Sequence, residues 1–267
     1  MKHFLVSARK YRPLSFGDVV GQHAVTTTLG NAIANKQMAQ AYLFCGPRGV
    51  GKTTCARIFA REINTEPDAV KEPDYAFNIF ELDAASNNTV EDIRSLIDQV
   101  RIPPQTGRYK VYIIDEAHML SQAAFNTFLK TLEEPPEHAV FILATTEKHK
   151  ILPTILSRCQ IFDFNRISVS EIEGHLRQIA KKENIETEDE ALNIIAIKAD
   201  GALRDALSLF DQLVSYSESK LTYKTVIENL SILDYEYYFK TTSAILQHDT
   251  AGALLLLDDI LKKGFDA

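Results

Sequence analysis

The residues best suited to chemistry stand together between positions 46 and 53. The run Gly46-Pro-Arg-Gly-Val-Gly-Lys-Thr53 matches the phosphate-loop pattern G-x-x-x-x-G-K-[ST] between a strand-like and a helix-like segment. Its glycines let backbone N–H groups surround a phosphate, and the start of the next helix adds partial positive charge. The alternative, a chance glycine turn, would make that context a coincidence. The predicted nucleotide-binding residues here are Gly46, Pro47, Arg48, Gly49, Val50, Gly51, Lys52, Thr53 and Thr54.

Two carboxylates, Asp115 and Glu116, follow a buried apolar run and complete the predicted chemistry. In a phosphate-loop site, Lys52 reaches the β- and γ-phosphates, and the Thr53 hydroxyl ligates Mg²⁺ together with a strand-end carboxylate such as Asp115. The adjacent Glu116 could orient and deprotonate a water. The pair could instead only cap the following helix, but beside a phosphate loop it favours hydrolysis over simple nucleotide binding.

The elements that must position these residues alternate between strand and helix. Apolar runs predict strands at 41–45, 77–82, 111–114, 139–144 and 161–164. Apolar residues at helical spacing predict helices at 53–64, 89–100 and 124–132, the last ended by Pro135-Pro136. Continuous apolar strands alternating with amphipathic helices indicate an α/β fold, with a parallel sheet covered on both faces.

The pattern changes after Asn165, where only helices are predicted. Ser170 and Glu173 form the pattern of a capping box that begins a helix ending near residue 184. Thr187 and Glu190 form a second such pattern, whose helix ends near residue 201, and a third helix is expected at 203–214. Another helical stretch begins near residue 232. A small helical domain therefore follows the α/β domain.

Composition excludes several classes of protein. The 267 residues are 45% hydrophobic and 24% charged, typical globular values, and the net charge of −7 argues against coating nucleic acid by bulk attraction. Three scattered cysteines favour a reducing compartment over a disulfide framework. The sequence shows neither a signal peptide nor a run of the roughly 18 apolar residues of a membrane span. We expect a cytoplasmic protein without membrane contact.

With these motifs in view, the sequence resembles the AAA+ ATPases, and within them the bacterial clamp-loader branch, over essentially its whole length. The run ending in Pro135-Pro136 and the triplet Ser157-Arg-Cys159 are the most discriminating, because most other AAA+ proteins lack both. The resemblance rests on 8–13, 18–22, the phosphate loop, 82–86, 115–120, 129–136, 144–146, 157–159 and 201–206.

The resemblance implies further roles that the residues alone do not. Thr146 corresponds to a first sensor of the γ-phosphate, with Thr145 the second choice. Arg158 corresponds to an arginine finger acting on ATP held by a neighbouring subunit, and Arg204 to a second sensor that contacts the γ-phosphate. Without the resemblance, pairing within a sheet for the threonines and surface salt bridges for the arginines are the simpler interpretations. The implied wall of the adenine site comprises Arg12, Pro13, Val19 and Val20.

One departure from the family concerns zinc. Clamp-loader ATPases of this kind usually carry a four-cysteine zinc module after the phosphate-loop helix, but residues 62–75 here contain neither Cys nor His. We therefore expect no zinc and interpret this acidic, proline-containing stretch as a solvated connection.

Contact with DNA is less visible in the sequence. The helix start at 87–94 could hold a phosphate, or it could be an ordinary capped surface helix. A basic cluster at Lys2, Arg9, Lys10 and Arg12 could also bind nucleic acid, although the resemblance places it near the nucleotide.

Taken together, the resemblance implies an AAA+ parallel-sheet domain at 1–166, a helical lid at 167–231 and the start of a helical collar at 232–267, where we expect the chain to break off. It implies an ATPase that uses ATP and Mg²⁺ to open a sliding clamp and load it on primed DNA, with sister subunits and copies of itself as partners. No polymerase chemistry is predicted. The alternatives are a nucleotide-responsive scaffold, another AAA+ motor of DNA repair, and a helicase, since Asp115 to His118 also spells the D-E-A-H of helicases.

Overall fold

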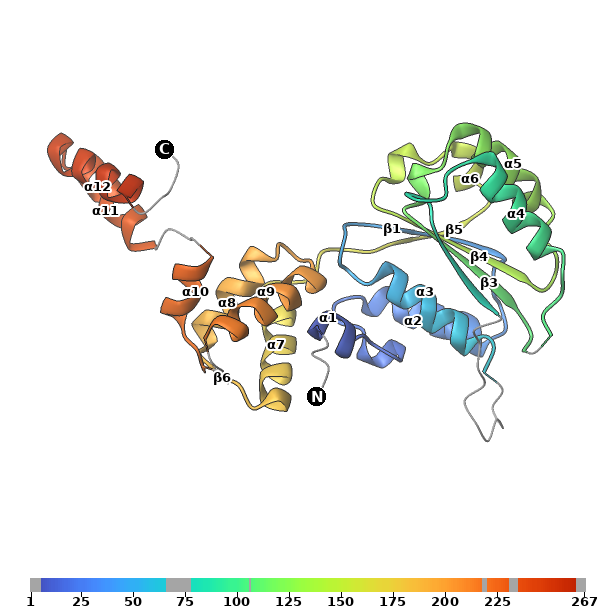
Figure 1. The fold of residues 1–267 in the computed structure, drawn as a ribbon, viewed down its shortest axis with the longest axis horizontal. Helices are drawn as coiled ribbons and strands as arrows, with labels where there is room; N and C mark the ends of the chain where they lie inside the picture. Colours follow the sequence, from blue (N-terminus) through green and yellow to red (C-terminus); the bar gives the residue numbers. More distant parts are fainter. Residues whose placement is uncertain (1–5, 66–77, 106, 218–219, 231–234, 263–267) are drawn as a thin grey trace.

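A parallel five-stranded sheet forms the centre of the larger lobe in the computed structural model, which describes residues 6–65, 78–105, 107–217, 220–230 and 235–262 (Figure 1). The strand order is β2-β3-β4-β1-β5. The central strands β1, β3 and β4 are almost wholly buried, as their apolar sequences predict. The strands are β1 (Ala41–Cys45), β2 (Ile79–Asp83), β3 (Lys110–Asp115), β4 (Ala139–Thr145) and β5 (Gln160–Asp163).

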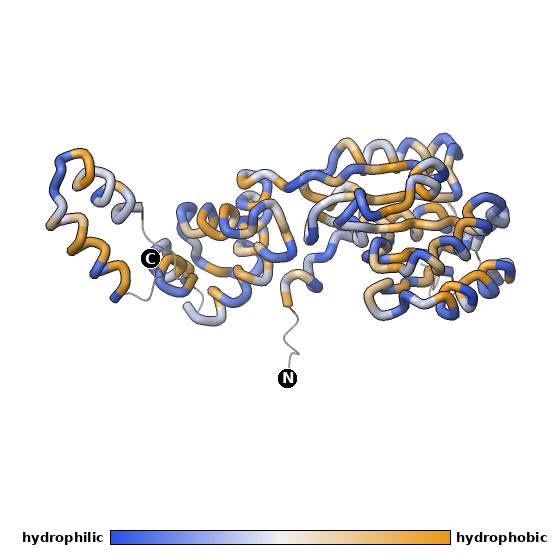
Figure 2. The backbone as a smooth tube through the Cα atoms, turned by 90° about the horizontal axis from the view of Figure 1, so that it is seen from above, coloured by the Kyte–Doolittle hydropathy of each residue, from blue (hydrophilic) through white to orange (hydrophobic). Residues whose placement is uncertain are grey.

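Helices cover both faces of this sheet. On one face, α2 (His23–Ala34) and α3 (Lys52–Glu62) pack on Tyr42, Phe44 and Ile113. On the other, α4 (Val90–Val100), α5 (Gln122–Glu133) and α6 (Pro153–Leu156) pack on alternate residues of the same strands. Figure 2 shows long hydrophobic segments running through this lobe. The predicted α/β class is confirmed, and each predicted strand is found within two residues of its expected bounds, except that Phe77, the predicted first residue of the second strand, lies outside the described residues.

The smaller lobe is a helical unit with its own core, which contains Ile172, Leu176, Leu192 and Phe210. Its helices are α7 (Val169–Glu183), α8 (Asp189–Lys198), α9 (Leu203–Tyr216) and α10 (Tyr223–Asn229). The expectation of helices alone is wrong in one detail, because short strands β6 (Glu186–Thr187) and β7 (Lys220–Leu221) pair in parallel.

Both predicted capping boxes of this lobe are corrected by the structure. The helix α7 begins two residues earlier than the Ser170 pattern suggests, with Ser168 as the cap and Glu171 as its partner. Thr187 caps nothing, because it belongs to β6; Glu188 stands at the start of α8 without a side-chain cap. Thr187 therefore pairs with β7 through its backbone, although the local sequence pattern predicts that its side chain caps a helix.

The first described residues bind the smaller lobe. The short helix α1 (Ser7–Lys10) packs on α9, where the backbone N–H and the hydroxyl of Ser7 both donate to Asp211. Lys10 and Tyr11 both donate to Glu183 at the end of α7. The chain then passes through the 3₁₀ helix η1 (Phe16–Asp18) into the sheet lobe. The segment therefore links the two lobes directly.

Two helices, α11 (Tyr235–Leu246) and α12 (Thr250–Lys262), pack on each other at the end of the molecule farthest from the sheet (Figure 1). Several of their apolar side chains are exposed, among them Phe239, Leu246 and Leu255.

Within the described ranges, no helix combines the length and apolar composition needed to cross a membrane. Most of the stretch 62–75, predicted to be a connection without zinc, lies outside the described residues.

Candidate nucleotide site

The phosphate loop joins β1 to α3, as the sequence predicts, and it lies at the junction of the two lobes. Its glycines are required by geometry. Gly51 immediately precedes α3 with φ +106°, in the region that favours glycine. Gly46 has φ +147°, and a Cβ there would lie 2.3 Å from the carbonyl oxygen of Phe164. The loop can therefore follow this backbone path only with glycine at these positions.

Lys52, the first residue of α3, is buried within this loop, with 6% of its surface exposed. Its Nζ donates to the carbonyl oxygens of Gly46 at 2.8 Å and Pro47 at 2.7 Å. Burial lowers the pKa of Lys52, and the negative charges of Glu116 and Asp115 act in the opposite direction. The carbonyl oxygens of Gly46 and Pro47 thus hold the ammonium group against the loop.

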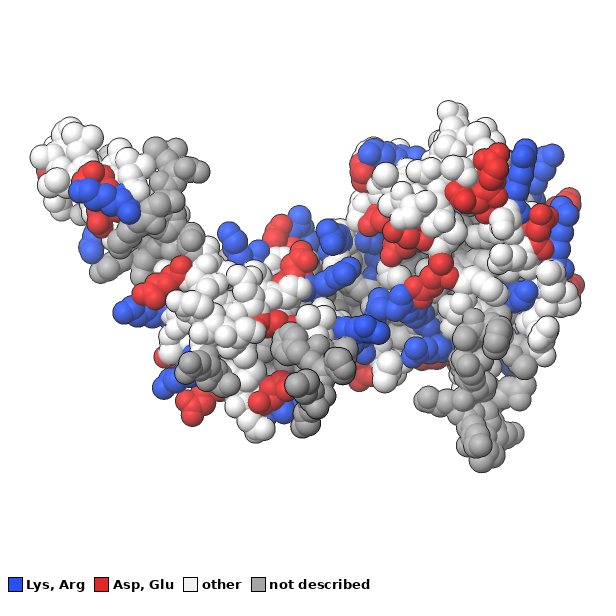
Figure 3. Space-filling view, in the orientation of Figure 1, with Lys and Arg blue, Asp and Glu red and all other residues white. Residues whose placement is uncertain are grey.

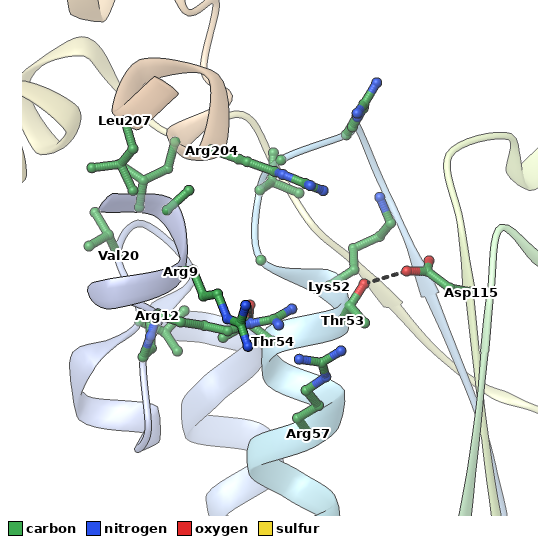
Figure 4. Close-up of a pocket in the computed structure, with 18 of the residues that line it drawn as sticks. Arg9, Arg12, Val20, Lys52, Thr53, Thr54, Arg57, Asp115, Arg204 and Leu207 are labelled. Atoms are coloured by element: carbon green, nitrogen blue, oxygen red, sulfur yellow. Dashed lines mark hydrogen bonds between the residues drawn. The ribbon is translucent and has the colours of Figure 1, made fainter. Parts of the chain in front are cut away.

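Thr53 and Asp115 are in direct contact across the site. The Thr53 hydroxyl donates to Asp115 Oδ2 at 2.8 Å, the dashed line of Figure 4. Asp115 ends β3, next to β4 in the sheet, and its Oδ1 accepts from the N–H of Glu116 at 3.0 Å. A hydroxyl and a carboxylate side by side are hard oxygen ligands of the kind Mg²⁺ prefers, so this donor set fits the predicted metal.

Glu116 adopts an uncommon backbone conformation beside the phosphate loop. Its φ of +47° is left-handed for a residue with a side chain, a strain that recurs at functional sites. Its Oε2 accepts from the hydroxyl of Thr146 at 3.2 Å. Thr145 is fully buried and bonds to His118 and to the N–H of Glu147 instead. The structure thus places Thr146, the preferred sensor candidate, against the candidate base.

A cavity of about 740 Å³ lies between the loop and the helical lobe. All four predicted adenine-wall residues line it, and Arg12 Nε donates to the Thr54 hydroxyl at 3.3 Å. Gly46, Pro47, Thr146 and Arg158 do not line it. Arg9, which the resemblance places near the nucleotide, lines the cavity as well. Residues that the sequence reasoning missed also form the wall: Val6, Ala8, Tyr11, Arg57, Glu81, Leu82, Asp83, Ile113, Ile167, Leu203 and Leu207.

Two signals could have found some of these residues. Arg57 stands one helical turn after Thr53 and therefore shares its face of α3. Asp83 ends β2 directly opposite Asp115 in the sheet register, and ligands of parallel sheets gather at such strand ends. For Tyr11 the only signal in the sequence was its proximity to the Arg12-Pro13 motif.

The cavity wall carries more positive than negative side chains. Figure 3 shows Lys and Arg side chains gathered over the junction of the two lobes. Burial lowers the pKa of Arg12, and the neighbouring guanidinium of Arg57 acts in the same direction. Arg57 itself pairs with Glu81. Such clustered cations suit a polyphosphate. The charged lining residues are Arg9, Arg12, Arg48, Lys52, Arg57, Arg204, Glu81, Asp83, Asp115 and Glu116.

Arg204 brings the helical lobe to the phosphate loop. Its backbone N–H donates to the Gly49 carbonyl at 3.4 Å, and a Cβ on Gly49 would lie 3.0 Å from that of Ala202. Its side chain extends from the start of α9 over the loop (Figure 4). Within the described residues, its guanidinium makes no hydrogen bond or ion pair. It is therefore available to a ligand in the cavity.

Arg158 lies outside this cavity. Its guanidinium pairs with Glu133 at 2.6 Å and donates to the carbonyl of Thr154 at 2.7 Å. The candidate DNA-binding residues also lie elsewhere: the helix start at 87–94 is closed by a capping box between Thr89 and Asp92. Of the predicted basic cluster, Arg9 and Arg12 line the cavity and Lys10 binds Glu183, while Lys2 lies outside the described residues.

Comparison with known proteins identifies the family. A family model described as "DNA polymerase III, delta subunit" matches residues 21–168, and one described as "DNA polymerase III clamp loader subunit, ATPase lid domain" matches residues 171–219. The chain is 37% identical to the DNA polymerase III subunit gamma of Buchnera aphidicola subsp. Acyrthosiphon pisum, across 99% of this chain and 76% of that protein. It belongs to the DNA polymerase III gamma/tau family of clamp-loader AAA+ ATPases.

Further relatives agree with this family. The DNA polymerase III subunit tau of Bacillus subtilis is 46% identical across 97% of this chain and 48% of that protein, and the tau subunit of Escherichia coli is 40% identical across 98% and 43%. The chain therefore spans about half the length of these curated relatives. In fold it is similar to the Thermotoga maritima RuvB Holliday junction branch migration motor (TM-score 0.66, 22% identity, 90% of this chain and 80% of that one).

Proposed function

We propose that this chain binds Mg-ATP in the cavity and hydrolyses it as a subunit of the bacterial DNA polymerase III clamp loader. The observation that carries the proposal is the side-by-side placement of Thr53 with Asp115 and of Thr146 with Glu116 around the phosphate loop. The clustered arginines of the wall and the match to clamp-loader family models support it.

Each residue has a defined task in this proposal. The loop N–H groups and Lys52 hold the β- and γ-phosphates, and Thr53 and Asp115 would hold Mg²⁺, which supplies charge neutralisation at the phosphates. Glu116 accepts a proton from the attacking water, and Thr146 holds its carboxylate in place. Arg204 contacts the γ-phosphate from the lid, so that nucleotide binding draws the two lobes together. Arg12, Pro13, Val19 and Val20 receive the base.

The remaining assignments concern assembly. We divide the chain into an ATPase domain at 1–166, a lid at 167–231 and part of a collar at 232–267. Arg158 acts on ATP bound to a neighbouring subunit, consistent with its position outside its own cavity. The partners are sister subunits, other copies of this chain, the sliding clamp and primed DNA: ATP binding favours the state that grips clamp and DNA, and hydrolysis releases them.

The test is ATP turnover with Mg²⁺, clamp and primed DNA for two variants. Lys52→Ala should abolish nucleotide binding, and Glu116→Gln should bind ATP normally but fail to hydrolyse it. If the Gln variant turns over at the normal rate, the role of Glu116 is wrong. Binding without turnover in the unsubstituted chain would indicate a scaffold, and unwinding of a labelled duplex would indicate a helicase-type motor.

We also propose that the chain holds no structural zinc, because its sequence lacks the cysteines of the usual module between 62 and 75. Elemental analysis of the purified protein should find no stoichiometric zinc. One tightly held zinc per chain would contradict this proposal.

A further inference from the structure

His118 is buried next to the candidate base, and none of the steps above uses it. It lies in the 3₁₀ helix η3 (Ala117–Met119), two residues after Glu116, and its side chain is only 7% exposed. Its Nδ1 lies 3.0 Å from Thr145 Oγ1 and 3.5 Å from Glu116 Oε2. Its Nε2 lies 3.3 Å from Glu147 Oε1. One imidazole therefore touches both the base and the segment that follows β4.

The partners decide which ring nitrogen carries the proton. Lys150 donates to Glu147 at 2.8 Å and lowers the pKa of that carboxyl, so Glu147 is an acceptor. The Nε2 of His118 thus faces an acceptor, which favours a proton on this nitrogen. The Thr145 hydroxyl oxygen already accepts from the N–H of Glu147 at 3.0 Å, which leaves its own proton for Nδ1. These two hydrogen bonds and the 3.3 Å approach of His118 Nε2 to the Glu147 carboxylate close a ring through His118, Thr145 and Glu147.

The ring holds both chain neighbours of Thr146. Thr145 is bound through its side chain, and Glu147 through its backbone N–H and its carboxylate. Thr146 lies between them and donates to Glu116 at 3.2 Å. The direction of the Thr146 hydroxyl, and with it the orientation of the Glu116 carboxylate, depends on this clamp.

We propose that His118 is a positioning residue for hydrolysis, which clamps residues 145–147 so that Thr146 holds Glu116 in its productive orientation. This inference rests on the proposed ATPase function of the same site. The proposal separates binding from chemistry: His118 does not itself line the cavity and contacts only Glu116 among the lining residues, so its loss should leave nucleotide affinity unchanged. A misplacement of a catalytic group by about 1 Å can cost roughly 10²-fold in rate.

The kinetic test is a double-mutant cycle with His118→Leu and Thr146→Val, in single-turnover hydrolysis of ATP by the full 267-residue chain. His118→Leu should slow the chemical step about tenfold to a hundredfold, with ATP affinity within about twofold of the unsubstituted chain. Because His118 acts through Thr146, the double variant should be no slower than the slower single variant. Additive losses, or weaker binding with an unchanged chemical step, would overturn the inference.

His149 supplies a matched control. It also lies near the Glu147 carboxylate, at 3.6 Å, but it is 76% exposed and outside the ring. His149→Leu should therefore hydrolyse ATP at the unsubstituted rate. If it slows the chemical step as much as His118→Leu does, the ring is not the cause and the inference fails.

A spectroscopic measurement tests the ring without catalysis. The ¹⁵N shifts of the His118 ring should show a proton on Nε2 and a hydrogen bond accepted at Nδ1. A proton on Nδ1 would overturn the inference, even if His118→Leu proved too unstable for kinetics. An unsubstituted chain that binds ATP but never hydrolyses it would contradict the proposed function alone. The ¹⁵N measurement of the His118 tautomer would then still test whether the ring of contacts exists.

Discussion

The position of Arg158 leads to a quantitative prediction about catalysis between subunits. Its guanidinium is held by Glu133 on the outside of the same lobe and lies away from the nucleotide cavity. To act as a finger it must exchange this partner for the γ-phosphate of a neighbouring subunit. Arg158→Ala should therefore remove a contribution to turnover that only an assembled complex can show.

The structure sets the size of the two competing effects. The side chains of Arg158 and Glu133 are 34% and 48% exposed, and exposed ion pairs contribute about 0–1 kcal/mol. An arginine finger contributes on the order of 10³ or more in rate, or about 4 kcal/mol of barrier. The exchange is thus strongly favourable. Glu133→Gln should raise turnover of the assembled complex by at most about fivefold, and the same change at exposed Glu134 should have no effect.

The assay is turnover per site across a concentration series, with sister subunits, clamp and primed DNA. Arg158→Ala should lower the assembled rate by about 10³ and leave the slow rate of the isolated chain unchanged. Mixing Arg158→Ala chains with Lys52→Ala chains should restore turnover, because one supplies the nucleotide site and the other the finger. Fast, concentration-independent turnover that collapses in Arg158→Ala would show action within one chain and refute the reasoning.

Three further predictions concern the lid and its contacts. Arg204→Ala should weaken ATP binding by about ten- to a hundredfold but ADP binding little, since a charged hydrogen bond to the γ-phosphate is worth about 1.5–3 kcal/mol; equal losses for both nucleotides in a titration would contradict this. Gly49→Ala should lower the melting temperature and the ATP affinity. The φ of Gly49 is +77°, a left-handed conformation that costs about 1–2 kcal/mol for a residue with a side chain, and the new Cβ would press on Ala202. In contrast, Gly174→Ala, in open space on α7, should raise stability by about 0.5–1 kcal/mol. Hydrogen bonds from Lys10 and Tyr11 lower the pKa of Glu183 below its usual value near 4.5, so its contribution to stability is present above that pH and is lost as the pH falls through the lowered pKa. Glu183→Gln should therefore reduce the acid-side loss of melting temperature, and an unchanged pH profile would argue against the contact.

Much of the sheet lobe could be predicted from the sequence because its signals are local. Apolar runs gave every strand of the sheet within two residues, and the phosphate-loop pattern placed Lys52 and Thr53 at the start of α3. Thr53, in the first turn of α3 after β1, lies beside Asp115, at the end of β3, because the carboxyl ends of parallel strands lie at the same edge of a sheet. Thr146, preferred over Thr145 on resemblance, is the one that touches Glu116.

Local patterns failed where distant segments compete for the same residues. Ser170 and Thr187 both had the spacing of helix caps, but Ser168 caps α7, and Thr187 pairs with β7 from more than thirty residues away. The hydrogen bonds of Ser7 to Asp211 and of Tyr11 to Glu183 join residues more than 170 positions apart. No periodicity encodes such contacts.

The sequence by itself determined the chemistry, because the glycines, the lysine, the hydroxyl and the carboxylates of a nucleotide site act through residue type and short spacing. Only the tertiary structure decided how these groups are held: the left-handed backbone of Glu116, the ring around His118 and the approach of Arg204 to Gly49. Each depends on side chains or backbone brought together by the packing of whole elements, whose relative positions are set by the buried cores of both lobes.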